Sequence, residues 1–306
     1  MPEPPSGRQF EIGQGQQRAV ITEVGATLRS YSVAGHEVLD GFEVQEMCSA
    51  GRGQLLLPWP NRIRDGSYSF EGIEHQLPLT EPERGNAIHG LVRWEAWQPH
   101  EQSAGRLLMR HRLHPQQGYP FDLDLSVEYS VSEDGLTLRT TAVNVGPGSC
   151  PFGAGAHPYV TVGGERIDSA TLRLPAETWL ESDDRAIPVA RAAVRGTQFD
   201  FLEPRPIADT RLDTGYGDLR RDADGKAHAI VSSADGRSAT VWMDEAFPYL
   251  MVFTGDPLEP GRRRRGIALE PMTCPPNAFQ TGEAVRILQP GERFEGAWGI
   301  TPAPLQ

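Results

Sequence analysis

The chain has 306 residues, and its 33 glycines and 26 prolines make about one residue in five poorly suited to the interior of a helix. This composition argues against a helical bundle. Asp and Glu (41) outnumber Lys and Arg (29), and the resulting net charge of −12 repels a nucleic-acid backbone, so we expect no nucleic-acid partner.

The three cysteines, Cys48, Cys150 and Cys274, are widely separated and form no CxxC pair. This set predicts neither a disulfide framework nor a zinc site, which fits a reducing compartment. The N-terminal segment lacks a basic stretch followed by an apolar one, and the chain contains no run of about eighteen apolar residues. We therefore expect a cytoplasmic protein that does not enter a membrane.

Short segments with strand character follow one another along the chain and are separated by turn signals such as Asp65-Gly66 and Asp235-Gly236. The clearest runs from Phe121 to Val131, where apolar side chains alternate with polar ones, and a turn at Glu133-Asp134-Gly135 predicts a hairpin. The predicted strands are Arg18 to Thr22, Thr27 to Val33, Ser67 to Phe70, Arg106 to Arg112, Phe121 to Val131, Leu136 to Ala142, Ala170 to Leu174, Ala227 to Ser232, Ala239 to Trp242 and Leu250 to Thr254.

No long amphipathic helices alternate with these strands, so a parallel α/β sheet is disfavoured. We predict an all-β fold, an antiparallel sandwich of several sheets. No linker or change in composition divides the chain, which indicates a single domain over residues 1–306. The basic run from Arg262 to Arg265 is interpreted as a solvated loop.

Four segments place polar side chains among glycine, proline and aromatic residues, outside the alternating pattern. The first, PWPNRI, draws Arg62 inward, where a carboxylate or carbonyls in the core satisfy its guanidinium or it clamps substrate hydroxyls. The second, NAIHGLVRW, contains His89, for which a structural hydrogen-bonding role competes with a catalytic one. Gly90 follows it and admits the close approach of a ligand or of backbone.

The third segment, GAGAHPY, carries His157, and its small residues predict open space beside the imidazole. In the fourth, GIALEPMTCPPNA, Glu270 closes an apolar run, where desolvation would raise the pKa of its carboxyl towards that of a general base. The alternative is a glutamate at a strand end that pairs with a neighbouring arginine. The chain has no nucleotide-binding, zinc-protease or serine-hydrolase motif.

In this order and at these intervals, the four segments resemble the aldose 1-epimerase (galactose mutarotase) family. The resemblance runs from about Gly13 to Ile300, and an FTGD segment before ALEPMTCPPNAF adds to it. It implies a β-supersandwich fold and an isomerase that interconverts the α and β anomers of a free aldohexose such as glucose or galactose. It implies no metal and no cofactor.

The resemblance also implies roles for the three titratable residues of these segments. Glu270 would be the general base for the C1 hydroxyl, and His157 the general acid for the ring oxygen. His89 would hydrogen-bond the sugar near that oxygen, and the two histidines could exchange the acid role.

The same resemblance implies that Arg62 and Asn61, in the PWPNRI block, bind the substrate. Asp213 is the best match to an aspartate that holds sugar hydroxyls, although Thr214 and Tyr216 depart from the family pattern after it. Asp209 is the alternative.

Two other functions on the same fold compete with this reading. A hexose-6-phosphate 1-epimerase would need basic side chains for the phosphate, and Arg52, Arg64, Arg84 and Arg93 lie near the motif segments. A non-catalytic sugar-binding protein would not require an acid/base pair. We expect a monosaccharide as the small-molecule partner and a chain that is a monomer or a homodimer.

Overall fold

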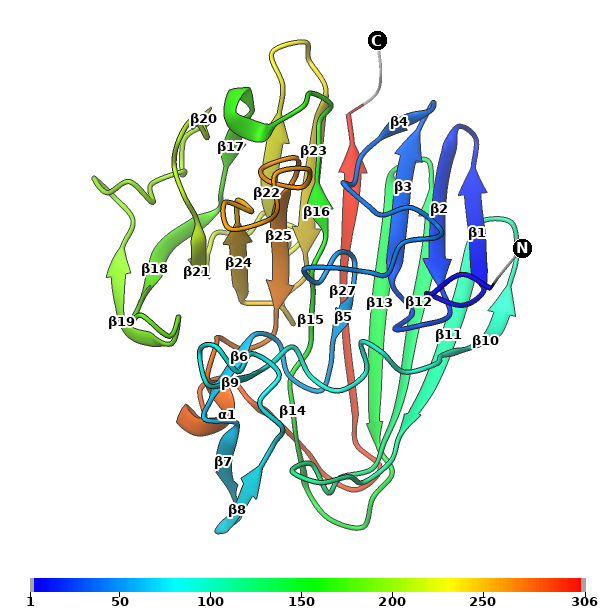
Figure 1. Ribbon diagram of the computed structural model, residues 1–306, viewed down its shortest axis with the longest axis vertical. Helices are drawn as coiled ribbons and strands as arrows, with labels where there is room; N and C mark the ends of the chain where they lie inside the picture. The colour runs from blue at the N-terminus through cyan, green and yellow to red at the C-terminus, as the bar shows by residue number, and fades with distance from the viewer. Residues whose placement is uncertain (1–2, 304–306) are drawn as a thin grey trace.

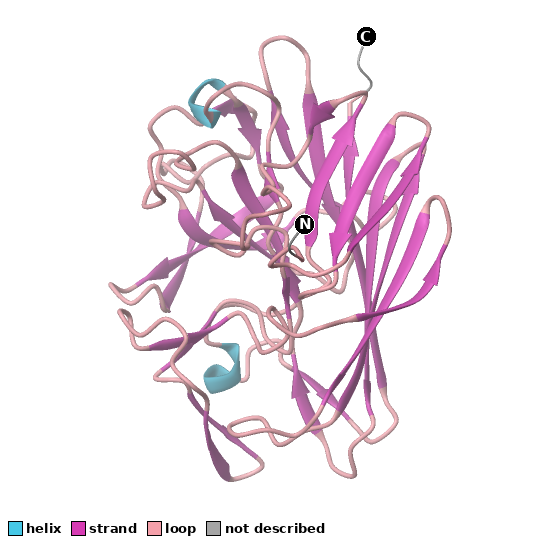
Figure 2. Cartoon of the chain, turned by 45° about the vertical axis from the view of Figure 1, so that its right-hand side comes forward, coloured by secondary structure: helices cyan, strands magenta, loops and turns pink. Residues whose placement is uncertain are grey.

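A computed structural model describes residues 3–303 and consists almost entirely of antiparallel strands (Figure 1). The all-β prediction is therefore confirmed. Within the described residues, helix is confined to two short turns, η1 (Ile167–Ser169) and α1 (Ala278–Thr281), which stand out in Figure 2. Neither has the length or the apolar character to cross a membrane, and no other helix occurs in this part of the chain.

The larger of two main sheets has nine antiparallel strands. Across the sheet these are β10 (Gln98–Gln102), β11 (Arg106–Leu113), β12 (Leu123–Ser132), β13 (Gly135–Asn144), β27 (Arg293–Pro302), β23 (Ser238–Met243), β22 (Ala227–Ser232), β17 (Thr171–Arg173) and β20 (Arg205–Pro206). The predicted hairpin joins β12 to β13, with Ser132 opposite Gly135. β27, which the sequence did not predict, joins the two halves of this sheet by pairing with β13 and β23.

The second main sheet has eight strands and carries most of the motif residues. In order it contains β19 (Pro188–Ala193), β18 (Ala176–Ser182), β21 (Asp213–Leu219), β24 (Tyr249–Phe253), β25 (Ile267–Met272), β15 (Gly155–Ala156) and β5 (Leu55–Leu56), with β16 (Tyr159–Val160) also paired to β25. All of these pairings are antiparallel.

Four smaller sheets complete the fold. One contains β1 (Gln9–Gln14), β2 (Gln17–Thr22), β3 (Leu28–Val33) and β4 (His36–Glu37), and the two-stranded ones pair β6 (Arg62–Arg64) with β9 (Asn86–Ile88), β7 (Ser67–Phe70) with β8 (Ile73–Gln76), and β14 (Cys150–Phe152) with β26 (Arg286–Leu288). The pair β6–β9 lies beyond the C-terminal end of β25 (Figure 1). This position brings the PWPNRI and NAIHGLVRW segments to that end of the eight-stranded sheet.

Alternation along the strands builds the core. In β12, buried Leu123, Leu125, Val127, Tyr129 and Val131 alternate with more exposed polar residues, as the period of two requires. Their apolar side chains belong to one continuous cluster that also contains residues of the eight-stranded sheet. The ten strands predicted from the sequence are all present, with ends that differ by no more than two residues.

The basic run from Arg262 to Arg265 is a loop, as predicted, but only Arg263 and Arg265 are exposed to solvent. Arg264 is buried and forms ion pairs with Asp168 and Asp256. Two other arginines of the run also pair with carboxylates, and only Arg263 is exposed without an ion pair among the described residues. A solvated position is therefore wrong for Arg262 and Arg264, because carboxylates of other segments pair with them.

Candidate active site

Glu270 occupies the middle of a fully buried strand. All six residues of β25 are buried, and Glu270 lies opposite Met251 of the neighbouring β24. The strand continues through Pro271 and Met272, so Glu270 does not end it as the sequence had indicated. A carboxylate in this position is almost completely removed from water, with a side chain only 2% exposed.

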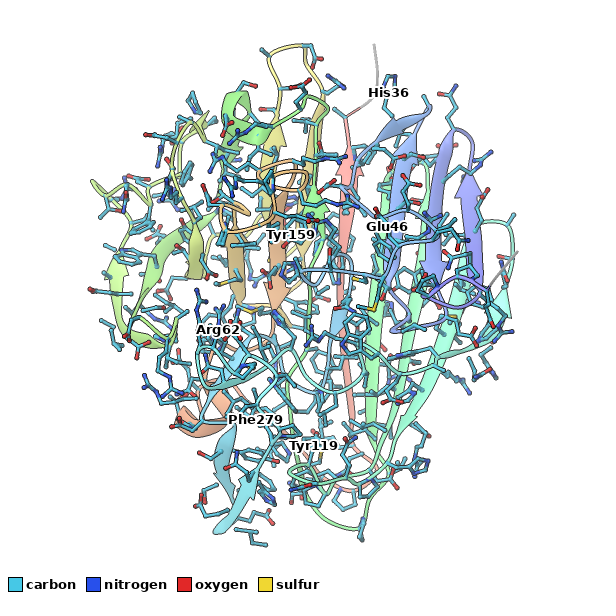
Figure 3. The ribbon with its side chains drawn as sticks, viewed as in Figure 1. His36, Glu46, Arg62, Tyr119, Tyr159 and Phe279 are labelled. Atoms are coloured by element: carbon cyan, nitrogen blue, oxygen red, sulfur yellow. The ribbon has the colours of Figure 1, made fainter. Side chains whose placement is uncertain are left out.

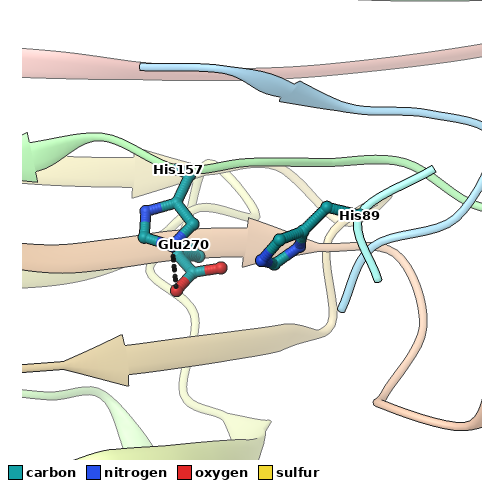
Figure 4. A group of neighbouring side chains, drawn as sticks. All are labelled: His89, His157 and Glu270. Carbon is teal, nitrogen blue, oxygen red and sulfur yellow. Dashed lines mark ion pairs between the residues drawn. The ribbon is translucent and has the colours of Figure 1, made fainter. Parts of the chain in front are cut away.

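His157 faces Glu270 because the strands on either side of it, β15 and β16, both pair with β25. Its Nε2 lies 3.3 Å from Oε1 of Glu270, the contact drawn as a dashed line in Figure 4. Oε2 of Glu270 and Nδ1 of His157 are buried and have no hydrogen-bond partner among residues 3–303. Buried polar atoms of this kind are uncommon and mark a position where a ligand can complete the hydrogen bonding.

Burial changes the proton affinity of both groups in the direction that disfavours charge. It raises the pKa of Glu270 well above the ordinary value, an effect that nearby Asp213 strengthens and Arg62 opposes. Burial, reinforced by the positive charge of Arg52, lowers the pKa of His157 to about 3. The pKa of Glu270 is thus shifted in the direction predicted for a general base. Its carboxyl contacts a histidine and not the arginine of the alternative interpretation.

His89 lies beside this pair in an unusual backbone conformation. It follows β9 with φ = 66°, in the left-handed region that residues other than glycine rarely adopt. The Asn61 amide donates to His89 Nδ1 at 3.2 Å, and the His89 amide donates to the Asn61 carbonyl at 2.9 Å. The first bond places the proton of a neutral imidazole on Nε2. Gly90 allows the close approach predicted for it, because an added Cβ would lie 1.9 Å from the carbonyl oxygen of Leu57.

Three side chains therefore converge from different segments (Figure 4). The ligating atoms of His89, His157 and Glu270 lie within 4.8 Å of one another, and the two imidazoles meet edge to face with centroids 5.5 Å apart. Two histidines and a glutamate are also a donor set of zinc sites. The Asn61 amide already occupies one nitrogen of His89, and the positive charges of nearby arginines disfavour a dication. We therefore interpret the trio as a proton-transfer site.

Arg62 lies at the start of β6, and a carboxylate satisfies its guanidinium, which is the first of the two roles considered for it. The second role, binding of substrate hydroxyls, is compatible with this contact. Its Nε and Nη2 donate to the carboxylate of Glu81 at 2.9 and 3.0 Å, and Nη2 also lies 3.7 Å from Asp213. A core carboxylate thus holds the guanidinium in place. Asn61, just before it, is 2% exposed, and its side-chain oxygen accepts a hydrogen bond from the Arg62 amide. Figure 3 shows Arg62 below Tyr159, near the lower end of the eight-stranded sheet.

Asp213 begins β21 and lies beside Arg62. Its Oδ2 is 3.5 Å from Nη1 of Arg84, and its side chain is 35% exposed. Asp213 is therefore more exposed than Glu270, His157, His89, Arg62 and Asn61, which are all buried. Asp209, the alternative aspartate, is exposed and forms no ion pair with any described residue.

Asp213 also borders a cavity of about 700 Å³ outside the trio. Five arginines and two aspartates line this cavity, together with three less polar residues. The lining consists of Arg84, Arg166, Arg211, Leu212, Asp213, Phe253, Asp256, Pro257, Arg263 and Arg264. Of the four arginines that the sequence offered for a phosphate, only Arg84 lies here.

The prediction that the small residues before His157 leave open space beside its imidazole is wrong. An added Cβ on Gly153 or Gly155 would come within 2.8 Å of Cys274 or Pro60, so these glycines permit close packing and leave no space. The residue that lies against the imidazole is Gly51, where an added Cβ would be 2.8 Å from Cδ2 of His157.

Glu81 and Gly51 contact the site but were not predicted from the sequence. Both lie outside the four motifs, in the segments TEPER and SAGRG, and only the fold brings them to the site. Proximity of Glu81 to the NAIHGLVRW block was the one available signal.

Comparison with known proteins agrees with this architecture. The family model described as Aldose 1-epimerase matches residues 8–301. The uncharacterized protein YihR of Escherichia coli K12 is 33% identical over 94% of this chain and 91% of its own, and the aldose 1-epimerase of Haemophilus influenzae is 24% identical over 69% and 68%. Among solved structures, a GalM/aldose epimerase homologue from C. elegans superimposes with a TM-score of 0.87 at 18% identity (98% and 100% covered). A galactose 1-epimerase from Lactobacillus acidophilus gives 0.78 at 22% identity (94% and 92%), and at this level such likeness concerns the fold.

Because the family model matches nearly the whole sequence and the antiparallel fold agrees with it, the chain belongs to the aldose 1-epimerase family.

Proposed function

We propose that the protein is an aldose 1-epimerase that interconverts the anomers of a free aldohexose by general acid/base catalysis at Glu270 and His157. The observation that carries the proposal is the buried pair with Nε2 and Oε1 3.3 Å apart and an unpartnered oxygen on Glu270. Opening a cyclic hemiacetal requires one proton to leave the C1 hydroxyl and another to reach the ring oxygen. This exchange needs two adjacent groups, one that accepts a proton and one that donates a proton.

In the opening step, the Glu270 carboxylate takes the proton of the C1 hydroxyl. The C1 oxygen becomes the carbonyl oxygen of the open-chain aldehyde, and the bond between C1 and the ring oxygen breaks with its electron pair on the ring oxygen. Imidazolium of His157 delivers a proton to that oxygen, so the pair ends as a carboxylic acid and a neutral imidazole. Rotation about the C1–C2 bond exposes the other face, and closure reverses both transfers.

The proton distribution of the pair fits the middle of this cycle. Burial favours the proton on Glu270 and a neutral His157, which is the form that the pair has while the sugar is open. In the resting pair, the 3.3 Å contact gives the Glu270 proton a direct path to His157, and this transfer produces the carboxylate and imidazolium that begin the opening step. The pair holds one proton throughout, so the scheme needs no cofactor.

The neighbouring residues would bind and orient the sugar. His89, with its proton on Nε2, would donate to the sugar near the ring oxygen, and Asn61 would act by fixing that tautomer. Arg62 would donate to sugar hydroxyls, and Asp213 would accept from them. Glu81 would hold the Arg62 guanidinium in place through two hydrogen bonds.

A second candidate, epimerisation of a sugar that carries an anionic group such as a phosphate, is favoured by the arginine-lined cavity. In an acidic protein, five arginines lie around a cavity that begins at Asp213, and four of them already form ion pairs with carboxylates. Arg263 is exposed and has no ion pair among the described residues, and Arg211 is 83% exposed with its nearest carboxylate oxygen 3.7 Å away, so these two arginines can turn to an anionic ligand.

The experiment is to follow the rotation of freshly dissolved α-D-glucose and α-D-galactose, and by NMR the anomeric exchange of D-glucose 6-phosphate, with and without the protein. Acceleration with the free sugars supports the first proposal. Acceleration of the phosphorylated sugar alone, lost in an Arg211→Ala/Arg263→Ala double variant, supports the second. Binding of a sugar without acceleration would contradict both and indicate a non-catalytic sugar-binding protein.

A further inference from the structure

Arg52 is a fully buried arginine outside the four sequence motifs, only 1% exposed. Nε and Nη2 donate to Oδ2 of Asp40 at 3.3 and 3.2 Å, and Nη1 donates to the carbonyl of Ser49 at 3.3 Å. Asp40 also lies 3.6 Å from Arg262 and 3.4 Å from Arg265. Burying a charge is costly, and the cost is offset here by an ion pair and a carbonyl.

The guanidinium of Arg52 packs on the ring of Tyr159, with Cζ 4.5 Å from the ring centroid. Tyr159 stacks in turn on the imidazole of His157, with centroids 4.9 Å apart and ring planes within 17° of parallel. The Tyr159 hydroxyl donates to the carbonyl of Ala50 at 3.0 Å, which fixes the ring in its plane. An arginine, a tyrosine and the candidate general acid thus form one continuous stack.

The backbone next to this stack forms hydrogen bonds with both the carbonyl and the amide of the His157 backbone. The Gly53 amide donates to the His157 carbonyl at 2.9 Å, and the His157 amide donates to the Gln54 carbonyl at 3.1 Å. Gly51 contacts the imidazole edge from the same loop. The segment of residues 49–54 therefore positions the histidine through its backbone and through the Arg52 side chain.

We propose that Arg52 is a positioning residue, which through Tyr159 holds the His157 imidazole in line with Glu270; this inference rests on the proposed function. The stack leaves the imidazole one orientation, in which Nε2 faces Oε1 of Glu270. Proton transfer depends steeply on such alignment. His157 contacts Glu270, His89 and Tyr159. The positive charges of Arg52, Arg93 and Arg62 lie close enough to favour the neutral imidazole.

The test compares Arg52→Met, Arg52→Lys, Tyr159→Phe and Tyr159→Leu. The Met and Leu variants remove a layer of the stack, so we expect kcat on α-D-galactose to fall roughly tenfold or more with KM within about twofold. The Phe variant keeps the ring, and the Lys variant keeps the cation over it, so both should retain kcat within about threefold. Because Asp40 keeps Arg262 and Arg265, the Met variant should still fold.

A second readout does not require turnover. In ¹⁵N-edited NMR spectra, the imidazole signal of His157, assigned by its loss in His157→Asn, should shift and broaden in Arg52→Met and Tyr159→Leu. Arg221→Met is the matched control, because Arg221 is a half-buried arginine that binds three carbonyls away from the site. It should lose stability without changing kcat or the His157 signal.

An unchanged kcat and an unchanged His157 signal in Arg52→Met would overturn the proposal, and so would equal losses of kcat in Arg221→Met. If the wild-type protein accelerates no sugar while the NMR changes occur, the proposed function fails and the positioning of His157 by Arg52 stands.

Discussion

Nε2 of His157 lies 3.3 Å from Oε1 of Glu270, while the other ring nitrogen and the other carboxyl oxygen are buried without a partner among residues 3–303. Burial lowers the pKa of His157 and raises that of Glu270, and both shifts favour the uncharged form of each group. Because the two groups are in contact, we expect them to titrate as a unit that carries one proton between the pKa of His157 and that of Glu270.

The activity should depend on pH as the pair does. A second proton reaches the pair only at His157, whose pKa is lowered to about 3, and the single proton leaves only above the ordinary pKa of Glu270, which burial raises. We therefore expect kcat/KM not to fall on acidification through about pH 6.5, where an ordinary histidine would titrate, and to fall on the alkaline side only above the raised pKa of Glu270. Initial rates of mutarotation, corrected for the buffer reaction, give the profile. A loss of kcat/KM on acidification with a midpoint near pH 6.5 would show that His157 is not buried in this way.

The raised pKa of Glu270 also predicts a pH-dependent cost in stability. Below pH 4.5 the carboxyl is protonated in both states, but above it the unfolded chain ionises while the folded protein keeps its proton. Glu270 thus removes stability from the wild-type protein as the pH rises towards the folded pKa, and Glu270→Gln lacks this contribution, whereas the lowered pKa of His157 affects both proteins alike. Urea unfolding at pH 5 and pH 8 should show the variant gaining on wild type with pH. A constant difference would mean that Glu270 ionises normally.

Arg62→Ala should raise KM and destabilise the fold. The substitution leaves the carboxylate of Glu81 without its two strong donors, and breaking a largely buried pair costs about 3 kcal/mol. Arg64→Ala is a matched control, because Arg64 belongs to the same strand but forms a more exposed ion pair with Asp183. Its cost should stay below about 1 kcal/mol, with KM unchanged. Equal KM values in wild type and Arg62→Ala would confine Arg62 to a structural role.

Gly51→Ala should lower kcat, whereas a control substitution with the same loss of stability should not. Gly51 has φ = 76°, and the new Cβ would come 2.8 Å from the His157 ring, which must then move. Gly35→Ala tests the backbone strain alone, because Gly35 has φ = 78° and no atom near the added Cβ. Both should lose roughly 1 kcal/mol in denaturant unfolding from the left-handed conformation. A kcat that falls equally in the two variants would contradict the role given to the Gly51 contact.

The sequence predicted the parts of the structure that depend on local pattern. Alternation located strands such as β12 and β22, and the motifs located the trio that meets in the structure. It did not predict β27, whose interrupted pattern became a strand by pairing on both edges. The single domain over residues 1–306 stays a prediction, and residues 1–2 and 304–306 lie outside the described part.

The contacts that the sequence could not provide are those between distant segments. Glu81 reaches Arg62, Gly51 reaches His157, and Arg264 is buried by Asp168 and Asp256, all through the tertiary fold. A composition of small residues predicted space at Gly153 and Gly155, but neighbouring strands pack against them. Side-chain volume in one segment says nothing about what the fold places opposite it.

The central claim is that Glu270 transfers the proton at C1, and polarimetry of fresh α-D-galactose with Glu270→Gln tests it most directly. Glu295→Gln, a substitution on β27 in a more exposed ion pair, serves as the control. The account predicts that wild type and the control accelerate mutarotation alike, while Glu270→Gln loses about two to four decades of kcat and still binds the sugar. Turnover by Glu270→Gln close to that of wild type would contradict it.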